Sequence, residues 1–125
     1  MGLEICKILI VDDHTGFRHT LKRFLTAKLP RPITLTEVDN GQAALALARE
    51  LKPDLVLMDV SMPGINGIQA ARLLKDEIPG VKVIILTVHD QDEYREAALR
   101  SRADGYVLKR TLDVELMPTI FRVCN

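Results

Sequence analysis

The fold class of this chain is decided by the stretch Ile8-Leu9-Ile10-Val11-Asp12-Asp13. Its first four residues are all aliphatic, with no polar residue between them. A strand with one face in water alternates apolar and polar residues, whereas a strand that is apolar at every position has both faces covered by helices. Residues Val83–Leu86 repeat the pattern. The two runs therefore predict a parallel sheet between two layers of helices.

Outward from these runs, two kinds of segment alternate along the chain. Short aliphatic and β-branched runs, typical of strands, are separated by stretches whose apolar residues recur every three or four positions, as in amphipathic helices. Glycine and proline fall between the segments. The order predicts an α/β fold with one doubly wound five-stranded parallel sheet, (βα)5, and one domain over residues 1–125. The expected strands are Ile5–Val11, Ile33–Val38, Leu55–Met58, Val81–Leu86 and Tyr106–Leu108, and the expected helices lie around residues 17–28, 44–51, 71–78, 92–101 and 113–123.

Charge and hydropathy exclude several classes of function. The 125 residues carry 17 basic and 17 acidic side chains, without the basic surplus typical of proteins that bind a phosphate backbone. We therefore expect no nucleic-acid binding by this chain alone. The longest apolar runs are too short to span a bilayer, so no membrane contact is expected. We expect Cys6 and Cys124 to be buried or half-buried free thiols of a cytoplasmic protein.

Polar residues follow four of the predicted strands. The first strand ends at Asp12 and Asp13, the third at Asp59, the fourth at Thr87 and the fifth at Lys109. The carboxyl ends of parallel strands share one edge of the sheet, where ligands bind. The second strand contributes nothing comparable and is expected at the sheet edge. Each acid alone is more simply a turn residue or a helix cap, but together these residues predict a site.

Three carboxylates at one edge need a counter-charge. Either a carboxyl pKa rises or a cation binds, and oxygen ligands from loops suit Mg²⁺, which keeps part of its water shell. Lys109 can bind one phosphoryl oxygen, and Thr87 can donate a hydrogen bond to another. This set of groups around one exposed carboxylate, Asp59, favours phosphoryl transfer to an aspartate.

Four linked motifs carry a family resemblance. They are ILIVDDH (8–14), DVSMPGING (59–67), ILT (85–87) and ADGYVLK (103–109). They resemble the motifs of response-regulator receiver domains, and more narrowly the subfamily that usually carries a LuxR-type helix-turn-helix output domain. The resemblance covers about residues 5 to 123. It implies a two-component phosphorelay, and a flavodoxin-like sheet with strand order 2-1-3-4-5 is expected.

The resemblance implies a Mg²⁺ site at the strand ends. In the family, the second acid of the pair and the acceptor aspartate bind the ion directly. In this sequence those residues are Asp13 and Asp59. Asp12 takes part through water, and the backbone carbonyl of Ser61 completes the set of ligands.

The resemblance also implies residues that sense the phosphoryl group. Thr87 and Lys109 match the family's hydroxyl and lysine, and Tyr106 matches the aromatic residue that changes rotamer on activation. Two positions depart from the pattern. Arg110 follows the lysine where proline with a cis bond is common, which leaves the isomer of that bond open. Arg102 stands where a small residue, usually glycine, is typical.

Histidines and one proline leave alternatives open. His14 and His19, five residues apart on the first helix, do not share a face and are expected to be solvated residues and not metal ligands. His89 follows Thr87 by two positions. The resemblance implies that His89 influences hydrolysis of the phosphate, and the alternative is a solvated loop histidine. Pro118 requires that the last helix begin late or lose a hydrogen bond.

We expect a switch rather than an enzyme. A histidine kinase donates the phosphoryl group, and a surface that includes the last helix then contacts a second copy or an output domain outside this chain. A phosphatase with an aspartyl nucleophile would usually have a second acid where Ser61 stands. A flavin- or nucleotide-binding module would need a Gly/Ser/Thr-rich loop where Asp12 and Asp13 stand. The last helix carries more apolar residues than one core-facing stripe needs, namely Leu116, Met117, Ile120 and Phe121.

Overall fold

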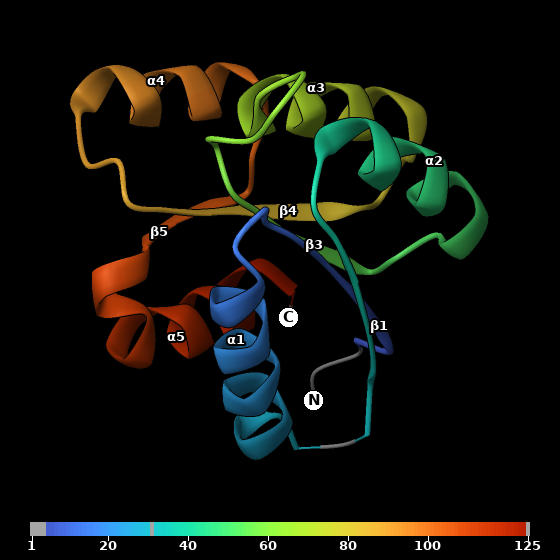
Figure 1. Ribbon diagram of the computed structural model, residues 1–125, viewed down its shortest axis with the longest axis vertical. Helices are drawn as coiled ribbons and strands as arrows, with labels where there is room; N and C mark the ends of the chain where they lie inside the picture. Colours follow the sequence, from blue (N-terminus) through green and yellow to red (C-terminus); the bar gives the residue numbers. More distant parts are fainter. Residues whose placement is uncertain (1–4, 31, 125) are drawn as a thin grey trace.

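The computed structural model describes residues 5–30 and 32–124, which form one five-stranded sheet with helices on both faces (Figure 1). Its elements in chain order are β1 (Lys7–Val11), α1 (Thr15–Lys28), β2 (Thr34–Val38), α2 (Gly41–Leu51), β3 (Leu55–Met58), α3 (Gly67–Glu77), β4 (Lys82–Thr87), α4 (Asp92–Arg100), β5 (Gly105–Leu108), the 3-10 turn η1 (Lys109–Thr111) and α5 (Leu112–Cys124). The strand order is β2-β1-β3-β4-β5, and all four pairings are parallel. The predicted fold class, the strand order and the edge position of β2 are confirmed.

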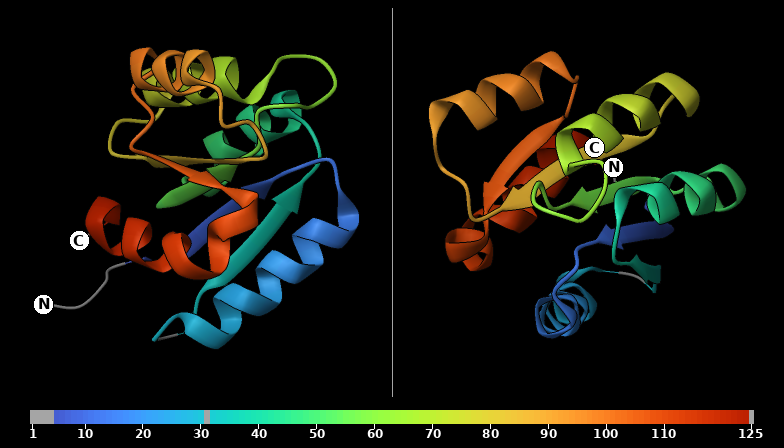
Figure 2. Two further views of the ribbon diagram at one scale, coloured as in Figure 1. Left: turned by 90° about the vertical axis from the view of Figure 1, so that its left-hand side faces the viewer. Right: turned by 45° about the horizontal axis from the view of Figure 1, so that its top comes forward.

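Two layers of helices enclose the sheet, as Figures 1 and 2 show. Helices α2, α3 and α4 cover one face, and α1 and α5 cover the other. Leu9 and Val11 of β1 pack in the first layer, whereas Ile8 and Ile10 pack in the second. Successive residues of a strand face opposite sides, so a strand between two layers is apolar throughout. The inference drawn from the aliphatic runs is therefore confirmed.

Helices α2 and α3 begin earlier than their apolar spacing predicted, because polar caps hold their first turns. The Asn40 side chain accepts a hydrogen bond of 2.8 Å from the Ala43 N–H. Asn66 and Gln69 form a capping box, in which each side chain accepts the other residue's backbone N–H. Such caps satisfy amides that have no partner within the helix. They also start α3 close to the end of β3.

Pro118 lies inside α5, which begins at Leu112. The late helix start offered as one alternative is therefore wrong, and the helix forgoes a hydrogen bond instead. An α-helical N–H at position 118 would have bonded the carbonyl of Val114. Next to the gap, the Thr119 hydroxyl donates to the Glu115 carbonyl at 2.8 Å.

The backbone conformation at Arg102 explains why glycine is typical at this position of the family pattern. Its φ is 66°, in the left-handed region that glycine adopts without steric cost. The arginine side chain pairs with the Asp76 carboxylate of α3. Its charge is thereby directed to the α3 side of the molecule and away from the strand-end acids.

Three further expectations have mixed outcomes. Both cysteines are free, but Cys6 is exposed, which corrects the expected burial; Cys124 is half-buried, and burial raises its thiol pKa to about 11. No peptide bond within residues 5–30 and 32–124 is cis, including the bond after Lys109. In the same part of the chain, no helix has both the length and the apolar character needed to cross a membrane.

Candidate functional site

Three aspartates meet where β1 and β3 end. The Asp59 N–H donates to the Val11 carbonyl (2.9 Å) and the Asp12 N–H donates to the Val38 carbonyl (3.1 Å), so sheet pairing continues past the strands and fixes the backbone of these acids. Asp12 and Asp59 are only 2% and 3% exposed, whereas Asp13 is exposed. The three predicted acids therefore come together, but the expectation of an exposed Asp59 is wrong.

Lys109 brings a cation to these acids. Its Nζ lies 2.7 Å from Asp12 Oδ2 and 3.6 Å from Asp59 Oδ2. The same nitrogen lies 4.3 Å from the centroid of the Phe17 ring, a cation–π contact from α1. The lysine thus reaches the predicted edge, but it pairs more closely with Asp12 than with Asp59, and the sequence did not indicate this.

The surroundings of Asp59 disfavour its charge. Burial raises the pKa of this carboxyl above its usual value, and the nearby Asp12 and Asp13 raise it further. Lys109 and the Val60 N–H, which donates to Asp59 Oδ1 at 2.8 Å, act in the opposite direction. A carboxylate in this position gains stability from any further cation that joins the site.

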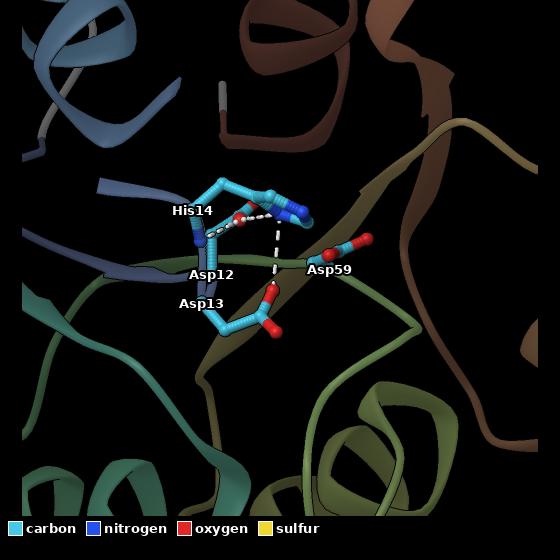
Figure 3. Close-up of side chains that lie close together, drawn as sticks. All are labelled: Asp12, Asp13, His14 and Asp59. Atoms are coloured by element: carbon cyan, nitrogen blue, oxygen red, sulfur yellow. Dashed lines mark hydrogen bonds and ion pairs between the residues drawn. The ribbon is translucent and has the colours of Figure 1, made fainter. Parts of the chain in front are cut away.

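Asp12, Asp13, His14 and Asp59 form a group that can hold a metal ion (Figure 3). One ligand atom from each residue lies within 4.8 Å of the others. The carboxylate oxygens suit a hard divalent cation, so these residues fit the Mg²⁺ that the family resemblance implies. His14 precedes α1 instead of lying on it, and the sequence did not predict its place beside the acids; His19, on α1, is exposed as expected.

His89 connects the loop after β3 with the last residue of β4 and with Tyr106 of β5. Its Nε2 shares a 2.7 Å hydrogen bond with Ser61 Oγ, and its N–H donates to Thr87 Oγ1 at 3.3 Å. Its carbonyl accepts the Tyr106 hydroxyl at 2.7 Å. The imidazole stacks on Tyr94 with ring centroids 4.4 Å apart. His89 is therefore a half-buried loop histidine whose side chain has partners, and its influence on hydrolysis of the phosphate stays a prediction.

Two glycines shape the loop between Asp59 and α3. Gly64 has a φ of 81°, which favours glycine, in the turn predicted from Met62-Pro63-Gly64. The Gly67 N–H donates to the Val60 carbonyl at 2.8 Å, and a Cβ at position 67 would lie 1.7 Å from the carbonyl oxygen of Asp59. The loop therefore folds back onto the backbone of Asp59 in a way that only glycine at position 67 permits.

Arg18 of α1 hydrogen-bonds to the backbone of Asp12 and to Glu37 of β2. Its Nη1 donates to the Asp12 carbonyl and its Nε donates to Glu37 Oε1, both at 2.6 Å. Lys22 donates to the other oxygen of Glu37 at 2.9 Å. The hydrogen bonds from Arg18 and Lys22 hold the pKa of Glu37 below its usual value. These contacts join α1 and β2 to the backbone of Asp12, and no sequence motif had singled out Arg18 or Glu37.

Comparison with known protein families agrees with this geometry. Residues 8–121 match the family model of the response regulator receiver domain. The chain belongs to this family. The match covers all five strand-end residues predicted from the sequence and every strand residue except Lys7 of β1. It confirms the resemblance drawn from the motifs. Receiver domains work in two-component systems, partner with histidine kinases and bind Mg²⁺ at an acidic pocket.

Relatives of this receiver domain are named response regulators, and DegU of Brevibacillus brevis is named a transcriptional regulatory protein. Response regulator GacA of Pseudomonas aeruginosa is 40% identical over 117 residues, which cover 94% of this chain and 54% of the relative. The nitrate/nitrite response regulator NarL of Escherichia coli is 35% identical over 106 residues, covering 85% and 49%. The chain spans about half the length of the curated relatives it matches.

A solved structure places the fold in the same group. The DNA-binding response regulator of the LuxR family from Staphylococcus aureus superposes with a TM-score of 0.87 at 30% identity, covering 97% of this chain and all of that one. The receiver domain of Thermotoga maritima CheB has a TM-score of 0.86 at 27% identity and covers 98% of each chain. The LuxR-type subfamily inferred from the motifs is confirmed.

Proposed function

We propose that this receiver domain takes a phosphoryl group from a histidine kinase onto Asp59. One observation carries the proposal: Asp59 is buried beside a cation, yet its Oδ2 lacks a close partner. Lys109 Nζ is 3.6 Å from that oxygen, and no residue of 5–30 or 32–124 donates a hydrogen bond to it. A carboxylate oxygen with unfilled capacity next to an ammonium group is a competent nucleophile for an incoming phosphoryl group.

The proposed transfer uses groups from three strands. The P–N bond of a phosphohistidine breaks, a P–O bond to Asp59 forms, and the imidazole leaves with the bonding electron pair. Charge is spread over the oxygens of the transferring group. Lys109 binds one of these oxygens, and the hydroxyl of Thr87 donates a hydrogen bond to another. The chain acts as the acceptor of this group and not as an enzyme with a separate substrate.

We propose Mg²⁺ as the cofactor. Asp13 and Asp59 would bind it directly, Asp12 through water, and Ser61 through its backbone carbonyl. When bound, the ion neutralises charge on the carboxylates and on the transferring group. The raised pKa of Asp59 supports this role, because a buried carboxylate gains from a nearby cation. The 2.7 Å ion pair of Asp12 with Lys109 supports an indirect role for Asp12, whose charge already has a partner.

Thr87 and Tyr106 are the proposed switch. If the Thr87 hydroxyl turns toward a phosphoryl oxygen, the His89 N–H loses its acceptor and the loop after β4 can move. Tyr106 is bonded to the carbonyl of the same residue, so the two shifts are coupled. Arg95 of α4 lies 4.7 Å from the centroid of the Tyr106 ring. The local change thereby reaches α4, as in other switches that bias two states of one surface.

The proposed output is a protein–protein contact. Residues 1–125 would act as one receiver domain in the cytoplasm that controls a transcriptional output domain, with no direct contact to nucleic acid or membrane. Helix α5 exposes Val114 and Phe121, 70% and 44% accessible to solvent. Exposed apolar residues favour contact with another protein surface. Phosphorylation would accordingly favour a homodimer through a surface that includes α5.

Intact-mass spectrometry after treatment with acetyl phosphate and Mg²⁺ tests the acceptor. The wild-type chain should gain one phosphoryl group, and Asp59→Asn should gain none. Asp90→Asn is the matched control, because Asp90 is an exposed acid in the loop after β4 and its ion pair with Arg110 is also exposed. The control should label fully. Full labelling of Asp59→Asn would overturn the assignment.

Asp13→Ala tests the proposed metal site. The variant should lose both Mg²⁺ binding, measured by titration calorimetry, and labelling by acetyl phosphate. Its thermal stability should rise, because one of three crowded carboxylates is removed. If Asp13→Ala bound Mg²⁺ as tightly as the wild type, the ion would have to bind elsewhere.

A further inference from the structure

The imidazole of His14 lies among the acids of the site, although the proposed function does not use it. Its Nδ1 is 3.0 Å from Asp13 Oδ1 and 3.1 Å from Asp12 Oδ1. Figure 3 shows the ring turned toward both carboxylates. The His14 N–H also donates to Asp12 Oδ1 at 2.9 Å, so the turn that carries the ring is fixed by the same acid. The position of the nitrogen is therefore built into the loop after β1.

We propose that His14 makes this site a mixed nitrogen and oxygen site, which binds a first-row transition ion such as Co²⁺, Ni²⁺ or Zn²⁺ more tightly than Mg²⁺. His14 Nδ1 would be a ligand together with carboxylate oxygens of Asp13 and Asp59. The proposal rests on the proposed function only in that it uses the same carboxylates. It adds a ligand and a class of metal ion, which would compete with Mg²⁺ for the site.

The spacing of the donor atoms supports a shared ion. Two ligands that bind one ion at about 2.1 Å, at right angles to each other, lie about 3.0 Å apart. The separation of His14 Nδ1 and Asp13 Oδ1 is 3.0 Å. Lys109 pairs with Oδ2 of Asp12, the oxygen that His14 does not approach. The ammonium group therefore does not occupy the side of the acids on which the imidazole lies.

The chemistry of the donor atoms determines which metal ions bind more tightly when His14 is a ligand. Mg²⁺ prefers oxygen ligands and gains little from an imidazole, whereas Co²⁺, Ni²⁺ and Zn²⁺ bind imidazole well. The side chain of His14 is 67% exposed, so the ring can adjust to an ion without disturbing the core. A simple hydrogen bond from the imidazole to the two acids is the competing explanation. That explanation predicts that removal of His14 leaves the ratio of Co²⁺ to Mg²⁺ affinity unchanged.

Metal titration of the chelator-treated chain separates the two explanations. Dissociation constants for Co²⁺ and Mg²⁺ are measured by calorimetry, and Co²⁺ binding is followed as well by its visible absorption. We expect the ratio of Co²⁺ to Mg²⁺ affinity to fall at least tenfold in His14→Ala, with a change in the Co²⁺ spectrum. His19→Ala, which removes an exposed histidine of α1, should keep the wild-type ratio and spectrum. Thermal unfolding of each variant establishes that it is folded.

An unchanged affinity ratio and spectrum in His14→Ala would overturn the inference. Equal losses in His14→Ala and His19→Ala would overturn it too, because the effect would not depend on the site. Labelling of the wild-type chain by acetyl phosphate with Mg²⁺ alone is scored separately. A chain that labels normally but shows no effect of His14 on the ratio refutes only the inference. A chain that fails to label refutes the proposed function, whatever the Co²⁺ titration gives.

Discussion

Gly67→Ala should displace the proposed phosphoacceptor through its own backbone. A Cβ at this position would lie 1.7 Å from the carbonyl oxygen of Asp59 and 2.9 Å from Cγ of Met58, whereas ordinary contacts begin at 3.4 Å. The first neighbour is backbone at the end of a buried strand, so it cannot rotate away as a flexible side chain would. Relief requires a shift of roughly 1 Å or more between the start of α3 and the residue that carries the acceptor carboxylate.

The size of the effect follows from the two contacts that must change. Overpacking of a tight site costs about 1 to 3 kcal/mol. Separation of the segments also breaks the 2.8 Å bond from the Gly67 N–H to the Val60 carbonyl, and a buried group left without its partner costs about 1 to 3 kcal/mol. We expect a loss of at least about 3 kcal/mol in the free energy of unfolding. Labelling of Asp59 should fall at least tenfold, since the displaced carboxylate loses its alignment with the other groups.

Gly16→Ala is the matched control for this substitution. Gly16 lies in α1, and a Cβ there would meet nothing within 4 Å. The same added methyl group should stabilise the chain by up to about 1 kcal/mol, because glycine disfavours a helix relative to alanine. The contrast between the two variants isolates the close approach at position 67 from the general effect of glycine replacement.

Urea unfolding followed by circular dichroism measures both variants, since the chain has no tryptophan to serve as a fluorescent probe. With a denaturant slope of about 1 to 3 kcal/mol per molar urea, the expected loss lowers the midpoint of Gly67→Ala by about 1 to 3 M. If Gly67→Ala unfolded within about 0.5 kcal/mol of wild type and labelled normally, the loop could not be as tightly folded onto Asp59 as described.

Three further predictions concern charge and assembly. Asp59→Asn should raise the free energy of unfolding more at pH 7 than at pH 4. The pKa of the Asp59 carboxyl is raised above 3.8 in the native state, so the stability of the wild type falls as pH rises from the unfolded-state pKa to the native-state pKa. Equal gains in urea unfolding at both pH values would contradict this prediction. Arg18→Met should cost about 1 to 3 kcal/mol, and a double-mutant cycle with Glu37→Gln should reveal coupling of the pair; strict additivity would speak against it. Beryllofluoride should shift sedimentation from monomer toward dimer, and Phe121→Ser should weaken that shift; identical masses with and without the mimic would mean that the domain signals through a different chain.

The fold was predictable from residues whose surroundings depend on the sheet alone. The runs Ile8–Val11 and Val83–Leu86 are aliphatic because both faces of a central strand are covered, and this condition leaves a direct mark on the sequence. The bounds of the elements were less accurate. The start of α3 depends on the cap formed by Asn66 and Gln69. Helix α5 tolerates Pro118 in its interior because Leu116 before it and Ile120 after it are both buried in the core shared with the strands.

The sequence by itself determined which residues reach the carboxyl edge of the sheet. Asp12, Asp59, Thr87 and Lys109 lie there because parallel strands end on the same side, whatever the side chains do afterwards. The end of each predicted strand can therefore be placed at this edge from residue order alone.

Only the tertiary structure decided how these groups pair. Rotamers and loop conformations determine which groups meet: Lys109 pairs with Asp12, His14 approaches the acids, and His89 bonds to Ser61. The support that Arg18 gives to the backbone of Asp12 is of the same kind, since it joins residues on different elements. Such contacts have no sequence period. They are selected when side chains from separate elements compete for the same few positions in a packed and partly desolvated space, where charges and polar groups must find partners.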